Sequence, residues 1–291
     1  MAVQRVLRNT QATLEVTFYS SGVAADADGA VTVDITRADG TAFATGAATT
    51  KPGGTTGIYR YILAPQANLE YFTLVWNGTF GGVAQKITTH AEIVGAFYAP
   101  LNDIRAMKGL ADTAAFPNAL LEEARQWFED FAEQFCDRAF VPRFAIDRLD
   151  GDSTDTIRLN HIEPRTILSA KVAGVAQTGT ATWALYATGR VVRDVGSFDD
   201  GVRNVEVQYE YGADEPDLEL RSAALRAIQY RLLGDQLGLP AEAMSAAVDV
   251  RGPFSLLGPG GGGGGLSAGR PTGIPEVDAV LMNRSMAVWV G

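Results

Sequence analysis

The sequence predicts an α+β protein: an N-terminal β-sandwich domain, then a helical domain with a small antiparallel sheet, and an extended C-terminal arm. Short alternating strands fill the N-terminal third of the chain, and an amphipathic aromatic helix begins near Pro117. A second alternating strand runs from Val205 directly into an amphipathic helix that ends near Leu233. A chain of 291 residues is longer than one typical domain, so we expect more than one.

Residues 1–97 read as a domain built only of strands. Dipeptides such as Asp28-Gly29, Asp39-Gly40 and Asn77-Gly78 mark hairpin turns, because glycine accepts the positive φ that these turns need. Apolar residues alternate in three clear segments, Leu14-Val16-Phe18, Val31-Val33-Ile35 and Phe72-Leu74-Trp76. Short strands with turns about every ten residues predict an immunoglobulin-like β-sandwich without paired cysteines.

Residues 98–247 are predicted to form the helical domain. Its first long helix has apolar residues three and four apart, and its last follows Pro216 and stops at Gly238. Strands are expected between them, from Ile157 to Tyr211. The side chains that we expect in helix packing or in contacts between subunits are Leu121, Trp127, Phe128, Phe131, Phe135, Leu225, Ile228 and Leu232.

The C-terminal part divides into a glycine-rich linker over residues 248–273 and a docking arm over residues 274–291. The arm is too apolar for a discarded tail, so we expect it to bind a partner, by adding a strand to the partner's sheet for instance. Its proposed contact residues are Ile274, Pro275, Val277, Val280, Leu281, Met282, Val288, Trp289 and Val290.

Charge and composition exclude several classes of protein. The net charge of −10 argues against a general nucleic-acid binder, which needs a basic face to neutralise phosphates. Cys136 is the only cysteine, so no intramolecular disulfide forms, and its place on the apolar helix face indicates a buried thiol. No signal-peptide core follows Arg5 and Arg8, and no apolar run approaches the roughly 18 residues of a membrane span. We therefore expect a soluble protein made in a cytoplasm.

Catalytic and metal-binding patterns are weak. His90 and His161 are the only histidines, and each is interpreted as a strand or turn residue. The aspartate-rich segment from Asp147 to Asp155 lacks the EF-hand spacing, so a solvated turn is favoured over a calcium loop. The glycine run at Gly260 has no phosphate-loop lysine after it. We expect no catalytic residue, no metal and no cofactor.

Three arginines of the last helix, Arg221, Arg226 and Arg231, follow one another at steps of five. Such steps rotate by about 140° around a helix, so the three do not form one DNA-facing stripe. We expect them to pair with nearby carboxylates, Asp217, Glu219 or Asp235, with ion pairs to a neighbouring subunit as the alternative.

The region from Leu101 to Pro240 resembles the head-to-tail adaptor (head completion, or connector) proteins of tailed bacteriophages. The resemblance rests on the order of its segments rather than on one specific motif: Leu121 to Arg125 leading to Cys136 to Arg143, then the sheet, then Val205 to Gly212 with its Tyr-x-x-Gly ending, and Pro216 to Leu218. The N-terminal β-domain departs from the minimal pattern and is similar to extended adaptors of actinobacteriophages.

The resemblance implies a virion protein that forms a ring, typically of twelve copies, beneath the portal protein. Such a ring joins the DNA-filled head to the tail, contacts the next tail-proximal connector protein and continues the DNA channel. DNA would pass through it without sequence-specific binding, and no membrane is involved. The C-terminal arm would reach the portal or a neighbouring subunit.

Two alternatives come from other classes. A virion or surface protein could bind carbohydrate through its β-domain, which requires exposed aromatics, whereas Trp76 and Tyr71 lie in an alternating strand. A hydrolase with paired carboxylates is the weaker alternative, because nothing in the sequence marks such a pair among the 34 acidic residues.

Overall fold

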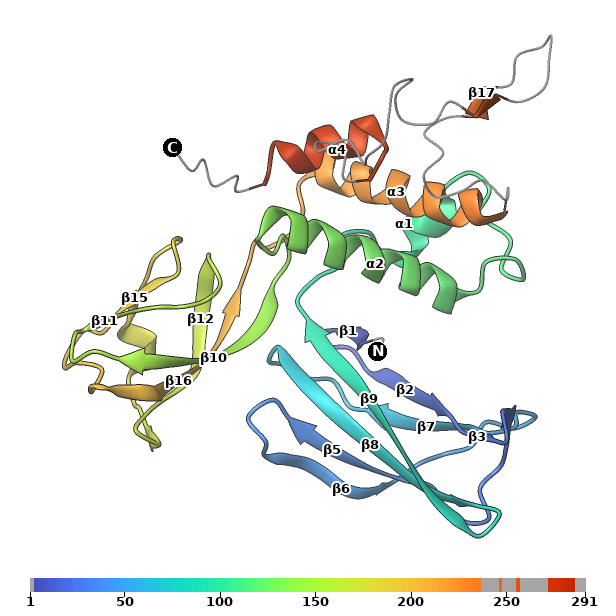
Figure 1. Ribbon diagram of the computed structural model, residues 1–291, viewed down its shortest axis with the longest axis horizontal. Coiled ribbons are helices and arrows are strands. Elements are labelled where there is room, and N and C mark those ends of the chain that lie inside the picture. Colours follow the sequence, from blue (N-terminus) through green and yellow to red (C-terminus); the bar gives the residue numbers. More distant parts are fainter. Residues whose placement is uncertain (1–2, 237–245, 248–254, 257–271, 286–291) are drawn as a thin grey trace. The chain divides into compact units, whose positions relative to one another are not determined.

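The computed structural model describes residues 3–236, 246–247, 255–256 and 272–285 (Figure 1). The chain forms two compact units. Unit 1 comprises Met1–Ala96 and Val141–Asp214, and unit 2 comprises Phe97–Phe140 and Glu215–Gly291. The chain therefore passes from one unit to the other three times.

The N-terminal part of unit 1 has one five-stranded sheet and two two-stranded sheets. Five strands lie in the order β1-β9-β8-β5-β6, β2 pairs with β7, and β3 with β4. β1 runs parallel to β9, and the other pairs are antiparallel. The strands are β1 (Val3–Leu7), β2 (Ala12–Thr17), β3 (Tyr19–Ser20), β4 (Val23–Ala24), β5 (Thr32–Arg37), β6 (Ala42–Ala48), β7 (Ile58–Leu63), β8 (Glu70–Phe80) and β9 (Val83–Val94).

The alternation in β8 explains how these sheets meet. Successive side chains of a strand point to opposite faces, so Phe72, Leu74 and Trp76 share one face, and each is at most 1% exposed. Leu14 of β2 and Leu63 of β7 belong to the same apolar cluster. The five-stranded sheet and the β2-β7 sheet therefore cover one core, in a sandwich arrangement. The immunoglobulin-like assignment stays a prediction.

The second part of unit 1 holds a four-stranded sheet in the order β10-β16-β12-β13 and a three-stranded sheet in the order β11-β15-β14. Val205, Val207 and Tyr209 of the central strand are fully buried. The Tyr209 hydroxyl donates a hydrogen bond of 2.8 Å to the buried Asp147 carboxylate. The elements are β10 (Arg143–Gly151), β11 (Thr156–Arg158), β12 (Pro164–Val172), β13 (Val175–Ala176), the 3-10 helix η1 (Thr180–Thr182), β14 (Ala184–Leu185), β15 (Arg190–Val192) and β16 (Gly201–Tyr211).

Unit 2 contains the α-helices. The apolar stripe of the first long helix is buried at Leu121, Ala124 and Phe128 and half-buried at Phe131 and Phe135. The helix ends at Cys136, and the next residue, Asp137, has a left-handed φ of 51°. The Asp217 carboxylate accepts a 2.8 Å hydrogen bond from the Leu220 N–H, which is the cap of the helix after Pro216. The elements are α1 (Leu101–Ala106), α2 (Asn118–Cys136), α3 (Leu218–Gln236), β17 (Ala246–Ala247), β18 (Ser255–Leu256) and α4 (Pro275–Met282).

The predicted fold class is wrong. The described residues are mostly β, with eighteen strands and four α-helices, and they do not show a helical adaptor domain with a sheet inside it. The prediction failed because it joined the helices and the strands between them by sequence order. The strands from β10 to β16 instead cluster with the N-terminal strands, and the helices pack with one another. The predicted extended arm is also wrong over Pro275–Met282, which is the helix α4; residues 286–291 lie outside the described residues.

Candidate interaction surfaces

The first surface is the seat of α4 on α2 and α3 of its own chain. Val277 and Leu281 are fully buried there. The Cys136 thiol at the end of α2 donates to the Leu281 carbonyl, with 3.5 Å between sulfur and oxygen. At the start of α4, the Asp278 carboxylate accepts bonds from the N–H and hydroxyl of Thr272, at 2.7 and 2.6 Å. An eight-residue helix is too short to persist alone, so these contacts maintain it.

Arg284 fixes the end of this segment. Its guanidinium lies 2.7 Å from the Asp217 carboxylate and 2.9 Å from that of Glu219, and it donates to the Val280 carbonyl at 2.9 Å. Burial alone would raise the pKa of Asp217, but the Leu220 N–H and Arg284 lower it below its usual value overall. The ionised carboxylate at the start of α3 therefore helps to hold α4.

A groove of about 440 Å³ runs between α3 and α4. An ion pair between Arg226 and Glu276 bridges the two helices, and the exposed Leu218 lies at its edge. Its walls are formed by Leu218, Glu219, Ser222, Ala223, Arg226, Glu276, Val277 and Val280.

The second surface is an aromatic ladder on α2, made by Trp127, Phe131 and Phe135. Their rings stack, with centroids 6.0 and 6.2 Å apart and interplanar angles of 17° and 15°. All three side chains are half-buried, whereas the neighbouring Phe128 is fully buried. The Arg231 guanidinium of α3 lies 4.5 Å from the centre of the Trp127 ring. Aromatic side chains and arginine are the residues enriched in protein interfaces.

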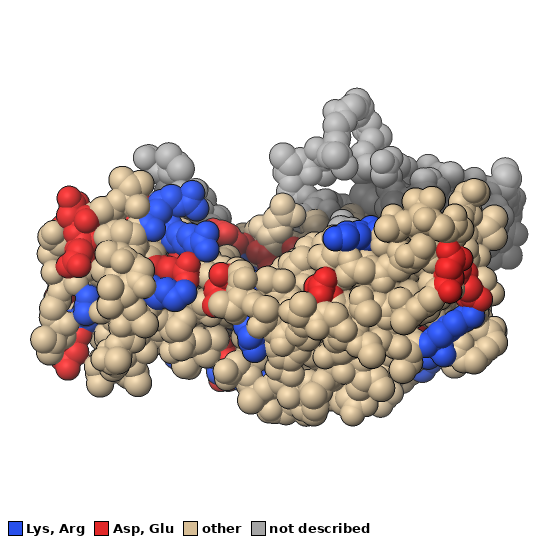
Figure 2. All heavy atoms as spheres, turned by 90° about the horizontal axis from the view of Figure 1, so that it is seen from below, with Lys and Arg blue, Asp and Glu red and all other residues tan. Residues whose placement is uncertain are grey.

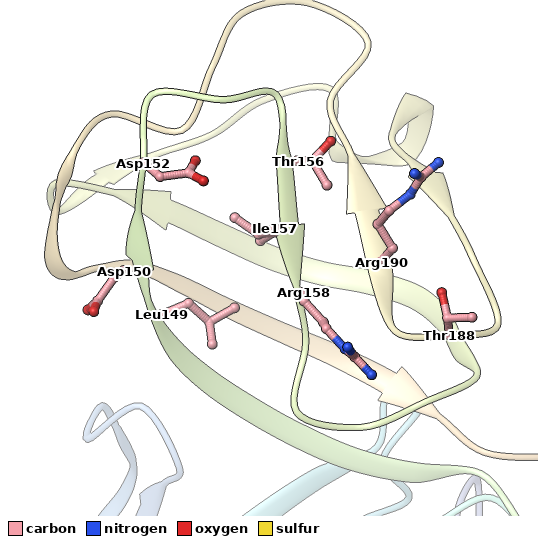
Figure 3. A pocket seen from close by; sticks show the side chains of 8 residues that line it. All are labelled: Leu149, Asp150, Asp152, Thr156, Ile157, Arg158, Thr188 and Arg190. Atoms are coloured by element: carbon pink, nitrogen blue, oxygen red, sulfur yellow. The ribbon is translucent and has the colours of Figure 1, made fainter. Parts of the chain in front are cut away.

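The third surface is an open pocket of about 580 Å³ in the small-sheet part of unit 1. Figure 3 shows two aspartates, Asp150 and Asp152, on one side of it and Arg158, Thr188 and Arg190 on the other. The Arg190 guanidinium lies 4.1 Å from the centre of the Tyr186 ring. The remaining wall is formed by Leu149, Thr156 and Ile157. The pocket is thus divided by charge.

The structure places the predicted contact residues differently from one another. Of the arm residues, Ile274 and Val280 are half-buried, and Pro275 and Met282 are exposed. Val288, Trp289 and Val290 lie outside the described residues. Of the helix residues, those buried are Leu121, Phe128, Ile228 and Leu232, and Leu225 is half-buried. Their roles in partner binding or subunit contact stay predictions.

The predicted partners of the three arginines of α3 are wrong. Arg221 pairs with Asp103 of α1, Arg226 pairs with Glu276 of α4, and Arg231 lies over Trp127 of α2. Packing of α3 against three helices brings these groups closer than the carboxylates of its own turns.

Both histidines lie against aromatic rings. His90 stacks on Tyr71 with ring centroids 5.5 Å apart, and His161 stacks on Tyr211 at 4.1 Å. His90 is half-buried, whereas His161 is exposed. Packing accounts for these two side chains, as the strand and turn interpretation expects.

Charge on the molecule is mixed. The face drawn in Figure 2 is largely uncharged, with basic and acidic side chains in small groups. Among the described residues, no three or more His, Cys, Asp or Glu side chains gather in a way that would hold a metal ion. None of the helices in the described ranges is both long and apolar enough to cross a membrane.

Sequence reasoning missed two elements of these surfaces, the Arg284 contacts and the arginine side of the pocket. Arg284 lies within the predicted arm, and the sequence gives no signal of its partner at Asp217. Arg158 and Arg190 become neighbours only through the register of β11 and β15. The tight turn before Arg190 joins β14 to β15, so no local signal in the sequence indicates the pairing of β11 with β15.

Comparison with known proteins identifies no family for this chain. No family model matches the sequence, and no curated protein matches it. Several solved chains match in structure, among them a chain of the neck of an empty GTA particle computed with C6 symmetry. That chain is 15% identical over 66% of this chain and 92% of its own length, with a TM-score of 0.37. At that score the likeness carries no weight in assigning a fold or a function.

Proposed function

We propose that this chain is a structural virion protein that forms a ring beneath the portal and joins the DNA-filled head to the tail. In this role the ring continues the DNA channel, and the protein acts through assembly rather than catalysis. The solved chain mentioned above comes from the neck of a GTA particle, and the proposal does not depend on that likeness.

The observation that carries the proposal is the aromatic ladder. Half-buried rings of Trp127, Phe131 and Phe135 form one continuous apolar strip on unit 2, flanked by Arg231. A strip of this composition loses water favourably when another protein covers it. A closed ring of identical subunits needs two different faces on each copy, and the ladder supplies one candidate.

The junction between β16 and α3 supports the choice of this kind of assembly. The strand ends at Tyr211, and Gly212 follows with a φ of 95°, which a glycine adopts without strain. Its N–H donates to the Glu163 carbonyl at 3.0 Å, and Asp217 then caps α3. This is one of the segments on which the resemblance to head-to-tail adaptors rests.

The decisive experiment is electron microscopy of particles made by a phage whose gene for this protein carries a nonsense mutation. We expect DNA-filled or leaking heads beside separate, complete tails, because a missing connector leaves each part intact. Normal joined virions would reject the proposal and bring forward the surface-binding module.

A variant series makes the same test residue by residue. The double change Trp127→Ala and Phe131→Ala, supplied from a plasmid, should fail to restore joined particles while the purified variant keeps its circular dichroism spectrum. Tyr19→Ala is the matched control, because that aromatic side chain is 57% exposed and lies outside the ladder. Full restoration by the ladder variant would remove the ladder from the assembly surface.

A truncation that tests portal binding by the C-terminal arm must leave the seat of α4 intact. Removing all residues from Ile274 would uncover the seat of α4, since Val277 and Leu281 are buried in unit 2. Ending the chain after Ser285 leaves that seat intact and removes Trp289. We expect this shorter truncation to abolish co-purification with the portal, and undiminished co-purification would contradict a role for the last residues.

The alternative of a carbohydrate-binding β-domain has no specific observation in its favour. Trp76 is fully buried, and its indole N–H donates to the Thr89 hydroxyl at 2.8 Å. Tyr71 stacks on His90. These aromatics serve packing within the domain.

A further inference from the structure

The pocket of unit 1 is lined by two arginines at opposite positions of a strand pair, and their guanidinium groups point in different directions (Figure 3). Arg158 of β11 is directly opposite Arg190 of β15. At the next position the Leu159 N–H donates to the Gly189 carbonyl at 2.8 Å, so the arginine pair is not itself hydrogen-bonded through its backbone. Opposed side chains come closest at such positions, and like charges there are unfavourable.

Nothing in the described part of the chain neutralises these two cations. Arg158 has no ion pair there, and Arg190 contacts only the Tyr186 ring. In the four-stranded sheet, by contrast, two cations are paired with a carboxylate. Arg148 of β10 and Lys171 of β12 both lie 3.0 Å from the Glu206 carboxylate of β16 between them. The two guanidinium groups are therefore available to bind an anion.

The same part of unit 1 presents a fixed acidic turn. Asp199 and Asp200 are exposed, and their carboxylates have no ion pair or hydrogen bond within the described ranges. The turn is rigid, because the Phe198 ring is fully buried and the Asn204 amide donates to the Asp199 carbonyl at 2.8 Å. By contrast, the nearby Asp150 carboxylate is occupied by the Arg203 N–H at 2.6 Å.

We propose that Arg158 and Arg190 of one copy bind the acidic turn Asp199–Asp200 of a second copy of this chain. The two surfaces use different residues, so each copy offers one of each, and the contact repeats from copy to copy. A contact of this kind closes into a ring when its rotation allows. The inference rests on the proposed ring and names one pair of surfaces that meet in it.

A charge exchange tests the contact. One variant carries Arg158→Glu and Arg190→Glu, and the other carries Asp199→Arg and Asp200→Arg. Each alone brings like charges together, whereas a mixture of the two restores opposite charges at every contact. We expect sedimentation velocity at low salt to show association of the wild-type protein and loss of it, by at least about tenfold, in each variant alone. The equimolar mixture should associate again.

The matched control is the double change Lys51→Glu and Lys86→Glu, which alters net charge equally at two exposed cations in the N-terminal part of unit 1. It should associate like the wild-type protein. Wild-type protein that stays monomeric, variants that associate unchanged, or a mixture that fails to recover would each overturn the proposed contact. The microscopy of mutant particles does not depend on this contact. If it shows separated heads and tails while the association experiment fails, the proposed function stands and only this pair of surfaces is rejected.

Discussion

Replacing Leu281 by alanine should open the seat of α4 without unfolding the rest of unit 2. The side chain is fully buried, and truncation of a buried leucine costs about 2–5 kcal/mol in protein cores. Val277 is the other fully buried apolar side chain of α4, and full burial of such a side chain contributes about 1.5–3 kcal/mol. A loss of about 3 kcal/mol corresponds to a roughly hundredfold increase in the open fraction of α4.

Cys136 provides the assay. It is the only cysteine of the chain, it is fully buried, and its thiol donates to the Leu281 carbonyl. Burial raises the pKa of this thiol to about 11, so the closed form holds little reactive thiolate near neutral pH. When closing is faster than modification, the rate with a thiol reagent follows the open fraction, so Leu281→Ala should react up to about a hundredfold faster.

The neighbouring change Met282→Ala is the control, because that side chain is 39% exposed and should leave the rate unchanged. Unfolding by urea, followed by circular dichroism, separates local opening from global unfolding. A wild-type rate in Leu281→Ala, or a rate increase fully explained by lower global stability, would refute the reasoning that α4 opens as a separate segment.

Three further outcomes follow from the structure. Because the pKa of Asp217 is lowered in the folded protein, its ion pair stabilises α4 above about pH 4 and that contribution is lost as the pH falls further, so amide exchange of α4 should accelerate only at acidic pH. Tyr209→Phe removes the hydroxyl donor to buried Asp147 and should lower the free energy of unfolding by about 1–3 kcal/mol in urea titrations; an unchanged midpoint would contradict this. Gly151→Ala places a Cβ onto a main-chain carbonyl oxygen and should lower the melting temperature, whereas Gly29→Ala, with open space around it, should not; equal effects would refute the steric argument.

Local periodicity predicted the elements that depend on it. The stripe from Leu121 to Phe135 gave α2, because apolar residues three and four apart form one face of a helix whatever lies opposite. The alternation of Phe72, Leu74 and Trp76 gave β8 and its buried face for the same reason. These patterns do not contain the grouping of elements, which is why the fold class was wrong.

Tertiary contacts decided what the sequence left open. The sequence predicted that the apolar segment around Val277 binds another surface. The segment alone could not reveal that this surface is formed by α2 and α3 of the same chain. The partners of Arg221 and Arg226 come from other helices, and the pairing of Arg158 with Arg190 depends on strand register. Each of these needs a position in space that no window of residues specifies.

The passage of the chain between the two units sets an order of events during synthesis. α2 is complete at Cys136, but α3, which covers its apolar stripe, begins only at Leu218, after the last strands of unit 1. At about 5–20 residues per second, roughly 4–16 seconds separate the two on the ribosome. During that interval Leu121 and Phe128 lack the neighbours that α3 supplies, so the nascent α2 exposes apolar surface until α3 is made.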